Sequence, residues 1–250
     1  MSEVGLTAVA ERVVLLETRR PPNNFFDEAL LTDLADALLS LDDDDDVSCV
    51  VLCSQGKHFC AGAELRGVGA AGIRRIYRQA FRIFSARKPM VAAIQGAAVG
   101  GGLGLAMAAD FRVAAPGARL TANFARLGFH HGFGLTVTLP RAVGHQRALE
   151  LLYTGQAVNG ERAVELGLCD RVADDPRAAA VEFAAQIAAS APLSVPAIRA
   201  TMRRSMIADI SAALDVEAGA QAALLGTPDF AEGISAAMEK RPPQFGRNHP

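Results

Sequence analysis

A segment without charged side chains before its last residue, Val91 to Asp110, constrains this chain more than any other, because three consecutive glycines lie inside it. Its first residues are short and apolar, as in a buried strand, whereas Leu103 and Leu105 favour a helix interior. Gly100 to Gly102 therefore lie between a strand and a helix N-terminus. Free N–H groups and the positive end of the helix dipole coincide there, so this turn can stabilise a carbonyl oxygen that gains negative charge. A tight turn or a packing site is the alternative for a glycine triplet taken alone.

A second segment upstream has the same design. The β-branched run Val47 to Cys53 indicates a strand, and the turn Ser54-Gln55-Gly56 follows it. Small residues come next, in the stretch Lys57 to Leu65 (KHFCAGAEL). Here too, a predicted strand leads into backbone with little side-chain cover.

Strand, turn and helix alternate from the N-terminus to about Val172, which predicts an α/β fold. Beyond Pro176 the pattern predicts only alanine-rich helices, the last with Thr227 as N-cap and Pro228 as its first residue. The expected strands are centred on Val13–Glu17, Val47–Cys53, Val91–Gln95, Phe111–Ala115 and Leu168–Val172, and a helix is expected to bury Ile73, Ile76, Tyr77, Ala80, Phe81 and Phe84.

The two glycine-rich and small-residue segments together resemble the crotonase superfamily, also called the enoyl-CoA hydratase/isomerase family. The resemblance covers essentially the whole chain, with further matching stretches at Arg19–Asn24, in the acidic run before Val47, at Lys88-Pro89 and at Glu239–Phe245. It implies an α/β crotonase-type spiral of ββα units over residues 1–190. It also implies a C-terminal helical region, residues 191–250, that serves trimerisation and active-site closure.

The resemblance implies that the backbone N–H groups of Ala63 and Gly101 form an oxyanion hole for the thioester oxygen of an acyl-CoA, and that an enolate forms there. Each such N–H is typically worth about 3 kcal/mol. The cofactor part of the substrate, CoA, is expected to contact the first segment and a C-terminal motif. The residues expected to contact it are Lys57, Ala61, Leu65, Arg66, Lys240 and Phe245. For Lys57, Arg66 and Lys240 the alternative is an ordinary exposed cation, and for Phe245 it is a packed aromatic side chain.

Two glutamates that familiar hydratases of this family use to activate water are absent from this chain. The resemblance places Gly104 at the first position and Phe124 at the second. Neither can move a proton, and losing one general acid or base commonly costs about a hundredfold in rate. Isomerisation, hydrolysis or another enolate reaction is therefore expected rather than standard hydration.

Adjacent histidines, His130 and His131, are the candidates for proton transfer. Imidazole titrates near neutrality, and a position just before the predicted helix Leu135 to Leu139 favours its neutral form. Relatives with other reactions place an aspartate near this loop position, aligned with His131, which is the preferred catalytic candidate. The alternative is that one histidine caps the helix and the other packs at a subunit interface.

Composition excludes several classes of function. A net charge of −2, with dispersed basic residues, gives no footprint for nucleic-acid or membrane-surface binding. The glycines and Gln95 argue against a membrane span in Val91 to Ala109, and Glu3, Glu11 and Arg12 interrupt any signal peptide, so a cytoplasmic location is expected. The four cysteines lack the spacing of a zinc site and are expected to be reduced.

We therefore expect an acyl-CoA enzyme of the crotonase fold that assembles as a homotrimer or homohexamer. No metal, nicotinamide or flavin is implied, and CoA enters only as part of the substrate. A homologue that binds acyl-CoA but has lost catalysis is the alternative, and the missing carboxylates favour it. RNA binding, known for one branch of the family, would need a lysine-rich helix, which this sequence does not offer.

Overall fold

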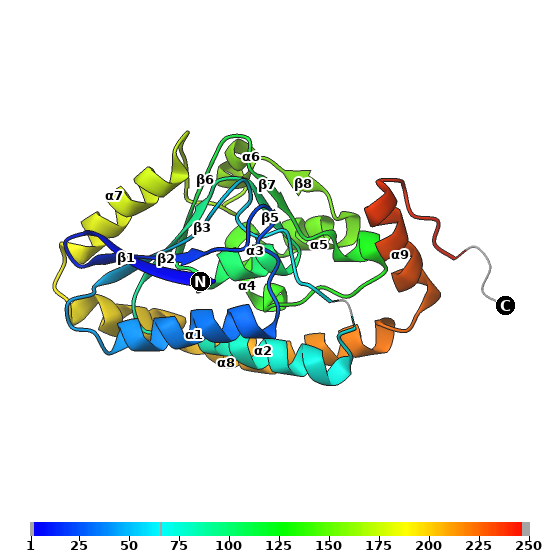
Figure 1. The fold of residues 1–250 in the computed structure, drawn as a ribbon, viewed down its shortest axis with the longest axis horizontal. Helices are drawn as coiled ribbons and strands as arrows, with labels where there is room; N and C mark the ends of the chain where they lie inside the picture. Colours follow the sequence, from blue (N-terminus) through cyan, green and yellow to red (C-terminus); the bar gives the residue numbers. More distant parts are fainter. Residues whose placement is uncertain (1–2, 66, 247–250) are drawn as a thin grey trace.

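The computed structural model describes residues 3–65 and 67–246 (Figure 1). Arg66, one of the expected CoA contacts, lies outside the described residues. A six-stranded sheet runs through the molecule in the order β1-β2-β3-β4-β6-β9, and all its pairings are parallel except β1 with β2. Its strands are β1 Val4–Ala10, β2 Val13–Thr18, β3 Cys49–Ser54, β4 Met90–Ile94, β6 Phe111–Ala114 and β9 Arg171–Val172.

Helices cover both faces of this sheet, which explains why its central strands read as continuous apolar runs. Every residue of β3 is buried. One helix lies on one side of the sheet and three others lie on the opposite side (Figure 1). They are α7 Pro176–Ala188 on the first side, and α1 Glu28–Asp42, α2 Ala70–Phe84 and α8 Ser194–Leu224 on the second.

A small second sheet provides the turns that matter for function. It has the order β5-β7-β8, with β5 Ala97–Val99, β7 Arg119–Thr121 and β8 Ala157–Val158. Each of β4 and β6 is followed by a strand of this small sheet and then by a helix, α3 Gly101–Ala108 or the 3-10 helix η1 Asn123–Leu127. The predicted α/β fold with repeated strand–strand–helix units is thereby confirmed.

The remaining helices complete the C-terminal half. They are α4 Leu135–Val143, α5 His145–Thr154, α6 Gly160–Glu165 and α9 Pro228–Glu239. The predicted start of α9 is confirmed, because the Thr227 side chain accepts a hydrogen bond from the Phe230 N–H at 3.2 Å and Pro228 opens the helix. No helix in the described part of the chain has the length and apolar character needed to cross a membrane.

Two features differ from the expectation. The strand expected over Leu168–Val172 is confined to β9, because the N–H groups of Leu168 and Cys169 both donate to the carbonyl of Ala163 at the end of α6. Strand β1 has no apolar alternation to reveal it, since most of its residues are exposed at the sheet edge.

Candidate active site

The two segments singled out in the sequence lie side by side. Cys60 forms a parallel bridge with Ala98 of β5: its N–H donates to the Ala97 carbonyl at 2.9 Å, and its own carbonyl accepts from the Val99 N–H at 3.0 Å. The first turn of α3 then lies directly against Cys60. A Cβ on Gly102 would be 2.1 Å from the Cys60 carbonyl oxygen, so only glycine allows this approach.

Ala63 is held by a second bridge, to Phe26. The Phe26 N–H donates to the Gly62 carbonyl at 3.0 Å, and the Glu64 N–H donates to the Phe26 carbonyl at 2.7 Å. These two hydrogen bonds involve the Gly62 carbonyl and the Glu64 N–H, on either side of Ala63, but not the N–H of Ala63 itself. Within the described residues, the Ala63 N–H has no hydrogen-bond acceptor.

Gly101 is the first residue of α3, where the backbone N–H lacks an acceptor by helix geometry. The preceding Gly100 has φ 55° and ψ −117°, a conformation that suits glycine, and its N–H donates to the Thr121 carbonyl at 2.8 Å. The ring of Phe26 lies against Gly101, since a Cβ there would be 2.6 Å from Phe26 Cζ. Phe26 thus touches both segments, and their two uncommitted N–H groups can stabilise an oxygen that gains negative charge.

Aromatic rings occupy the space at Gly104 and Phe124, the two positions at which the hydratase glutamates are expected to be missing. A Cβ on Gly104 would lie 2.5 Å from the Cβ of Phe133, whose ring packs against Phe26 at a centroid distance of 5.3 Å. Phe124 is buried, and its Cζ would lie 3.5 Å from a Cβ on Gly100. The Gly104 position is therefore closed by an apolar ring, and a second apolar ring lies over the glycine turn.

His130 and His131 lie in the loop before α4 with their rings stacked, the centroids 4.2 Å apart. Nδ1 of His130 lies 2.6 Å from the His131 carbonyl oxygen, and Nε2 of His131 lies 2.9 Å from Thr136 Oγ1. Burial, and secondarily the neighbouring His130, lower the pKa of His131 to about 4. The neutral form of His131 is therefore favoured mainly by burial of the imidazole away from water, and not chiefly by the helix dipole as the sequence suggested. In the described structure, neither imidazole hydrogen-bonds to the segments that carry Ala63 and Gly101.

Two polar residues of α8 were missed by the sequence reasoning. Glu217 is fully buried and binds the start of α4, and Gln221 donates to the His130 carbonyl at 2.8 Å while accepting from the Tyr77 hydroxyl at 2.7 Å. Both lie at helical spacing from the buried Ile210 and Leu214. A search for polar residues on the apolar face of this helix would have found them.

A cavity of about 590 Å³ adjoins the first segment at Glu64, the residue after Ala63. Its walls come from the start of α1, from the residues before α2 and from α2 itself. Glu28 and Arg75, both in its wall, form an ion pair at 2.7 Å. The cavity is therefore lined by both charged and apolar groups, and it reaches the candidate oxyanion segment.

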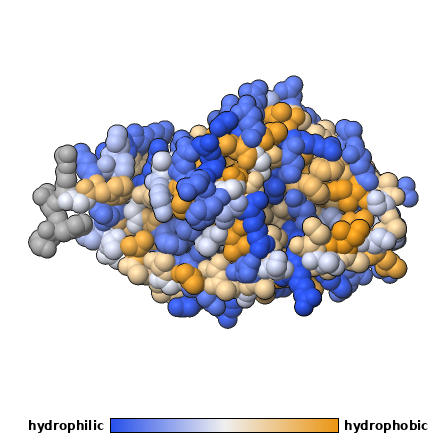
Figure 2. Space-filling view, turned by 180° about the vertical axis from the view of Figure 1, so that it is seen from behind, coloured by the Kyte–Doolittle hydropathy of each residue, from blue (hydrophilic) through white to orange (hydrophobic). Residues whose placement is uncertain are grey.

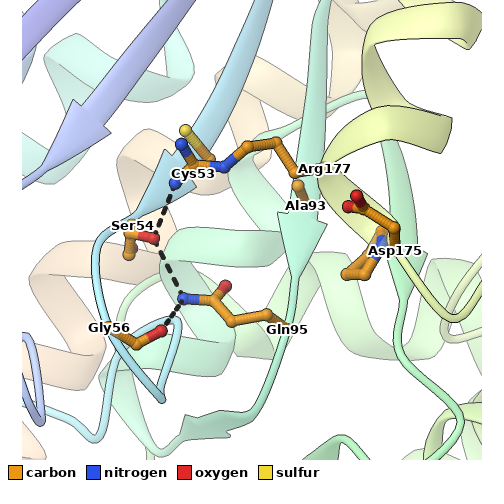
Figure 3. Close-up of a pocket in the computed structure, with 8 residues that line it drawn as sticks. Cys53, Ser54, Gly56, Ala93, Gln95, Asp175 and Arg177 are labelled. Atoms are coloured by element: carbon orange, nitrogen blue, oxygen red, sulfur yellow. Dashed lines mark hydrogen bonds between the residues drawn. The ribbon is translucent and has the colours of Figure 1, made fainter.

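A smaller cavity, of about 210 Å³, lies at the carboxyl ends of β3 and β4 beside the start of α7 (Figure 3). Gln95 donates to the carbonyls of Ser54 and Gly56 at 3.0 and 3.2 Å, and Arg177 donates to the Ser54 carbonyl at 3.0 Å. None of the predicted site residues lines this cavity. The Gln95 contacts instead fix the turn that leads into the Lys57 segment.

The predicted CoA contacts are dispersed. Lys57 is exposed, Leu65 is half-buried, and the Ala61 N–H donates to the Asn23 carbonyl at 2.9 Å. Lys240 ends α9 with a φ of 55° and is exposed. Phe245 is 36% exposed. Across the described ranges, no group of three histidine, cysteine or acidic side chains could hold a metal ion.

Comparisons with known proteins test the family resemblance. The sequence profile of the enoyl-CoA hydratase/isomerase family matches residues 9–248. The chain is 38% identical to a probable enoyl-CoA hydratase of Mycobacterium tuberculosis, over 94% of this chain and 97% of the relative. It is 31% identical to 1,2-epoxyphenylacetyl-CoA isomerase of Escherichia coli, over 98% of this chain and 99% of the relative.

Solved structures give the same result. The crystal structure of an enoyl-CoA hydratase/isomerase from Pseudoalteromonas atlantica superposes with a TM-score of 0.89 at 29% identity, and the match covers 98% of this chain and 100% of the other. The family resemblance predicted from the sequence is thereby confirmed. The chain belongs to the enoyl-CoA hydratase/isomerase family of the crotonase superfamily and is an enzyme of that family.

Proposed function

We propose that this enzyme binds an acyl-CoA with the thioester oxygen between the N–H groups of Ala63 and Gly101, and that turnover proceeds through the resulting enolate. One observation carries the proposal. Two backbone N–H groups without acceptors in the described structure lie on segments joined by the Cys60–Ala98 bridge, and one of them opens a helix. Such groups stabilise an enolate oxygen more than a neutral carbonyl, so they lower the barrier to proton removal.

The apolar side chains around the candidate site favour isomerisation, in which a proton moves along the acyl chain, or hydrolysis or another enolate reaction. They do not favour standard hydration. Phe133 fills the space beside Gly104, and Phe124 lies over Gly100, so neither place offers a carboxylate for holding water. In an isomerisation, a base takes a proton from Cα of a 3-enoyl thioester, and a proton is then delivered to Cγ. His131 is the proposed base, because its imidazole is held neutral and its Nδ1 accepts no hydrogen bond from the described residues.

The variants Gly101→Pro and Gly101→Ala test the oxyanion hole as a matched pair. Both add a Cβ facing Phe26, but only proline removes the N–H, and proline is well tolerated at the first position of a helix. We expect kcat/KM for 3-enoyl-CoA or crotonyl-CoA to be about 100-fold to 1000-fold lower in the proline variant than in the alanine variant. Equal activities in two equally folded variants would contradict the proposal.

Binding of acyl-CoA without turnover is a second candidate function. It is favoured by the aromatic surroundings of Gly104 and Gly100 and by the engagement of His131 with Thr136. Calorimetric binding of crotonyl-CoA and 3-enoyl-CoA, measured beside their turnover, separates the two candidates. Turnover that is abolished in His131→Ala would exclude the inert binder.

We also propose the sequence-based CoA contacts, assembly and location. Lys57, Ala61, Leu65, Lys240 and Phe245 would contact CoA, and no separate cofactor is part of the proposal. A homotrimer or homohexamer is supported by large apolar side chains that are exposed near and along the C-terminal helices, namely Leu193, Ile198, Met202, Val216 and Met238. The back of the molecule likewise shows hydrophobic residues among hydrophilic ones (Figure 2). A cytoplasmic location stays a prediction.

A further inference from the structure

The long helix α8 supplies a cap to α4 from outside that helix. Gly134 is the N-cap of α4, has a φ of 73° and carries no side chain to accept hydrogen bonds. The buried Glu217 takes that role: Oε2 accepts from the Gly134 N–H at 2.8 Å, and Oε1 accepts from the Thr136 N–H at 3.0 Å. A negative group at this position also interacts favourably with the helix dipole.

The same carboxylate orients the hydroxyl of Thr136. Thr136 Oγ1 donates to Glu217 Oε1 at 2.6 Å, so its single proton is committed and the oxygen can only accept from His131 Nε2, which lies 2.9 Å away. A neutral imidazole in this contact carries its proton on Nε2. The lone pair of Nδ1 then remains for another proton.

The backbone of the two histidines is fixed as well. Gln221 of α8 holds the His130 carbonyl, and the Tyr77 hydroxyl holds Gln221. Nδ1 of His130 lies 2.6 Å from the His131 carbonyl and must donate, because a carbonyl oxygen only accepts. Two residues of one helix, a turn apart, therefore position both the start of α4 and the loop before it.

We propose that Glu217 and Thr136 are positioning residues that hold His131 in its Nε2–H tautomer, so that Nδ1 is the atom that accepts a proton from the acyl-CoA. The proposal rests on the function proposed above, in which His131 is the base. Burial raises the pKa of Glu217, and its hydrogen bonds to Thr136 and Gly134 oppose this rise. The chain of contacts from Glu217 through Thr136 to His131, called the relay below, needs Glu217 as a carboxylate. The hydrogen bonds to Glu217 favour this charged form, whereas burial disfavours it.

The variants Thr136→Val and Thr136→Ser test the relay. Thr136 is exposed, so neither change disturbs the core, and both keep the backbone N–H that binds Glu217. Valine removes the hydroxyl, whereas serine keeps it. Asp215→Asn, at an exposed position of the same helix, serves as the control for a change on α8 that does not touch the relay.

Two measurements are needed: the imidazole nitrogen signals of His131 in protein labelled with 15N-histidine, assigned with His131→Gln, and the separate kcat and KM for an enoyl-CoA. We expect Thr136→Val to show a mixture of tautomers and a kcat about tenfold to a hundredfold lower, with KM changed far less. Thr136→Ser should show the same Nε2–H tautomer and nearly the same kcat as the wild type, and Asp215→Asn should leave both unchanged.

Failure of the relay and failure of the function give different results. If the wild-type protein turns over enoyl-CoA and Thr136→Val changes neither the tautomer nor kcat, the relay is overturned and the proposed function stands. If the tautomer changes in Thr136→Val but the wild-type protein turns over no acyl-CoA, the positioning of His131 is upheld and the proposed function is overturned.

Discussion

Gly104 and Phe133 share one space: a Cβ on the glycine would lie 2.5 Å from the Cβ of the phenylalanine and 2.9 Å from its Cγ. Phe133 adopts a φ of 59°, which is strained for a bulky residue, and the rings of Phe26 and Phe84 pack around it. The loop before α4 therefore closes the space beside Gly104, the position at which the sequence resemblance implies a glutamate in familiar hydratases. A change at Gly104 alone cannot introduce one.

Gly104→Ala should destabilise the protein by about 1–3 kcal/mol, although alanine is the better helix former, because its Cβ meets a well-packed aromatic side chain. Phe133→Gly removes that obstacle and suits the left-handed backbone, at the cost of lost packing. In the Phe133→Gly background, Gly104→Ala should be neutral or stabilising. Urea unfolding of the four proteins measures this coupling, and strictly additive changes would show that the two residues do not compete for space.

Gly102 makes a similar contact, but with backbone. Its Cβ would lie 2.1 Å from the Cys60 carbonyl oxygen, and no side-chain rotation can relieve that overlap. Gly102→Ala should therefore move the first turn of α3 away from the Cys60 segment, reducing kcat/KM at least tenfold and the free energy of unfolding by about 1–3 kcal/mol. Gly117→Ala, where a Cβ meets nothing within 4 Å, is the matched control and should change neither quantity. A fully active Gly102→Ala protein would argue against a fixed pairing of these segments.

Much of this architecture could be predicted from the sequence, because it depends on local patterns. Apolar runs indicated the central strands, the glycine triplet marked the start of α3, and Thr227-Pro228 marked the start of α9. Buried parallel strands and helix caps have these local signals. The edge strand β1 has no such signal.

The surroundings of the candidate site could not be predicted in the same way. Phe133 is distant in sequence from Gly104, and Glu217 lies 83 residues from the Gly134 N–H that it accepts from. No local sequence pattern indicates which helix start a buried glutamate will cap. The sequence analysis missed Glu217, although its helical spacing from the buried Ile210 and Leu214 indicates that its carboxylate faces inward.

Asp110 anchors α8 to the main sheet. It accepts from the Met90 N–H at 2.8 Å and pairs with Arg199 and Arg203 at 2.7 and 2.6 Å, and these charges lower its pKa despite its burial. Asp110→Asn would leave two largely buried guanidinium groups without a counter-charge, so we expect a loss of about 3 kcal/mol in the free energy of unfolding.

The control for Asp110→Asn is Asp209→Asn, which breaks an ion pair with Arg141 whose partners are both exposed to water. A change below about 1 kcal/mol is expected there. Urea unfolding at neutral pH measures both variants. Equal losses in the two would contradict a special role for the Asp110 cluster.

His131 should make the protein sensitive to acid. Burial lowers its pKa to about 4 in the folded protein, below its ordinary value of 6.5, so between these pH values the unfolded chain binds a proton that the folded protein does not. The stability contributed by the neutral imidazole is therefore present above pH 6.5 and is lost as the pH falls toward 4.

Over that range, His131→Gln should lose about 1–3 kcal/mol less stability than the wild type. Glu217, whose raised pKa acts in the opposite sense, is common to both proteins. Urea unfolding at several pH values measures the difference, with His145→Gln, at an exposed position, as the control. If the wild type and His131→Gln lose stability in parallel, the pKa of His131 is the same in the folded and the unfolded protein, and burial does not lower it.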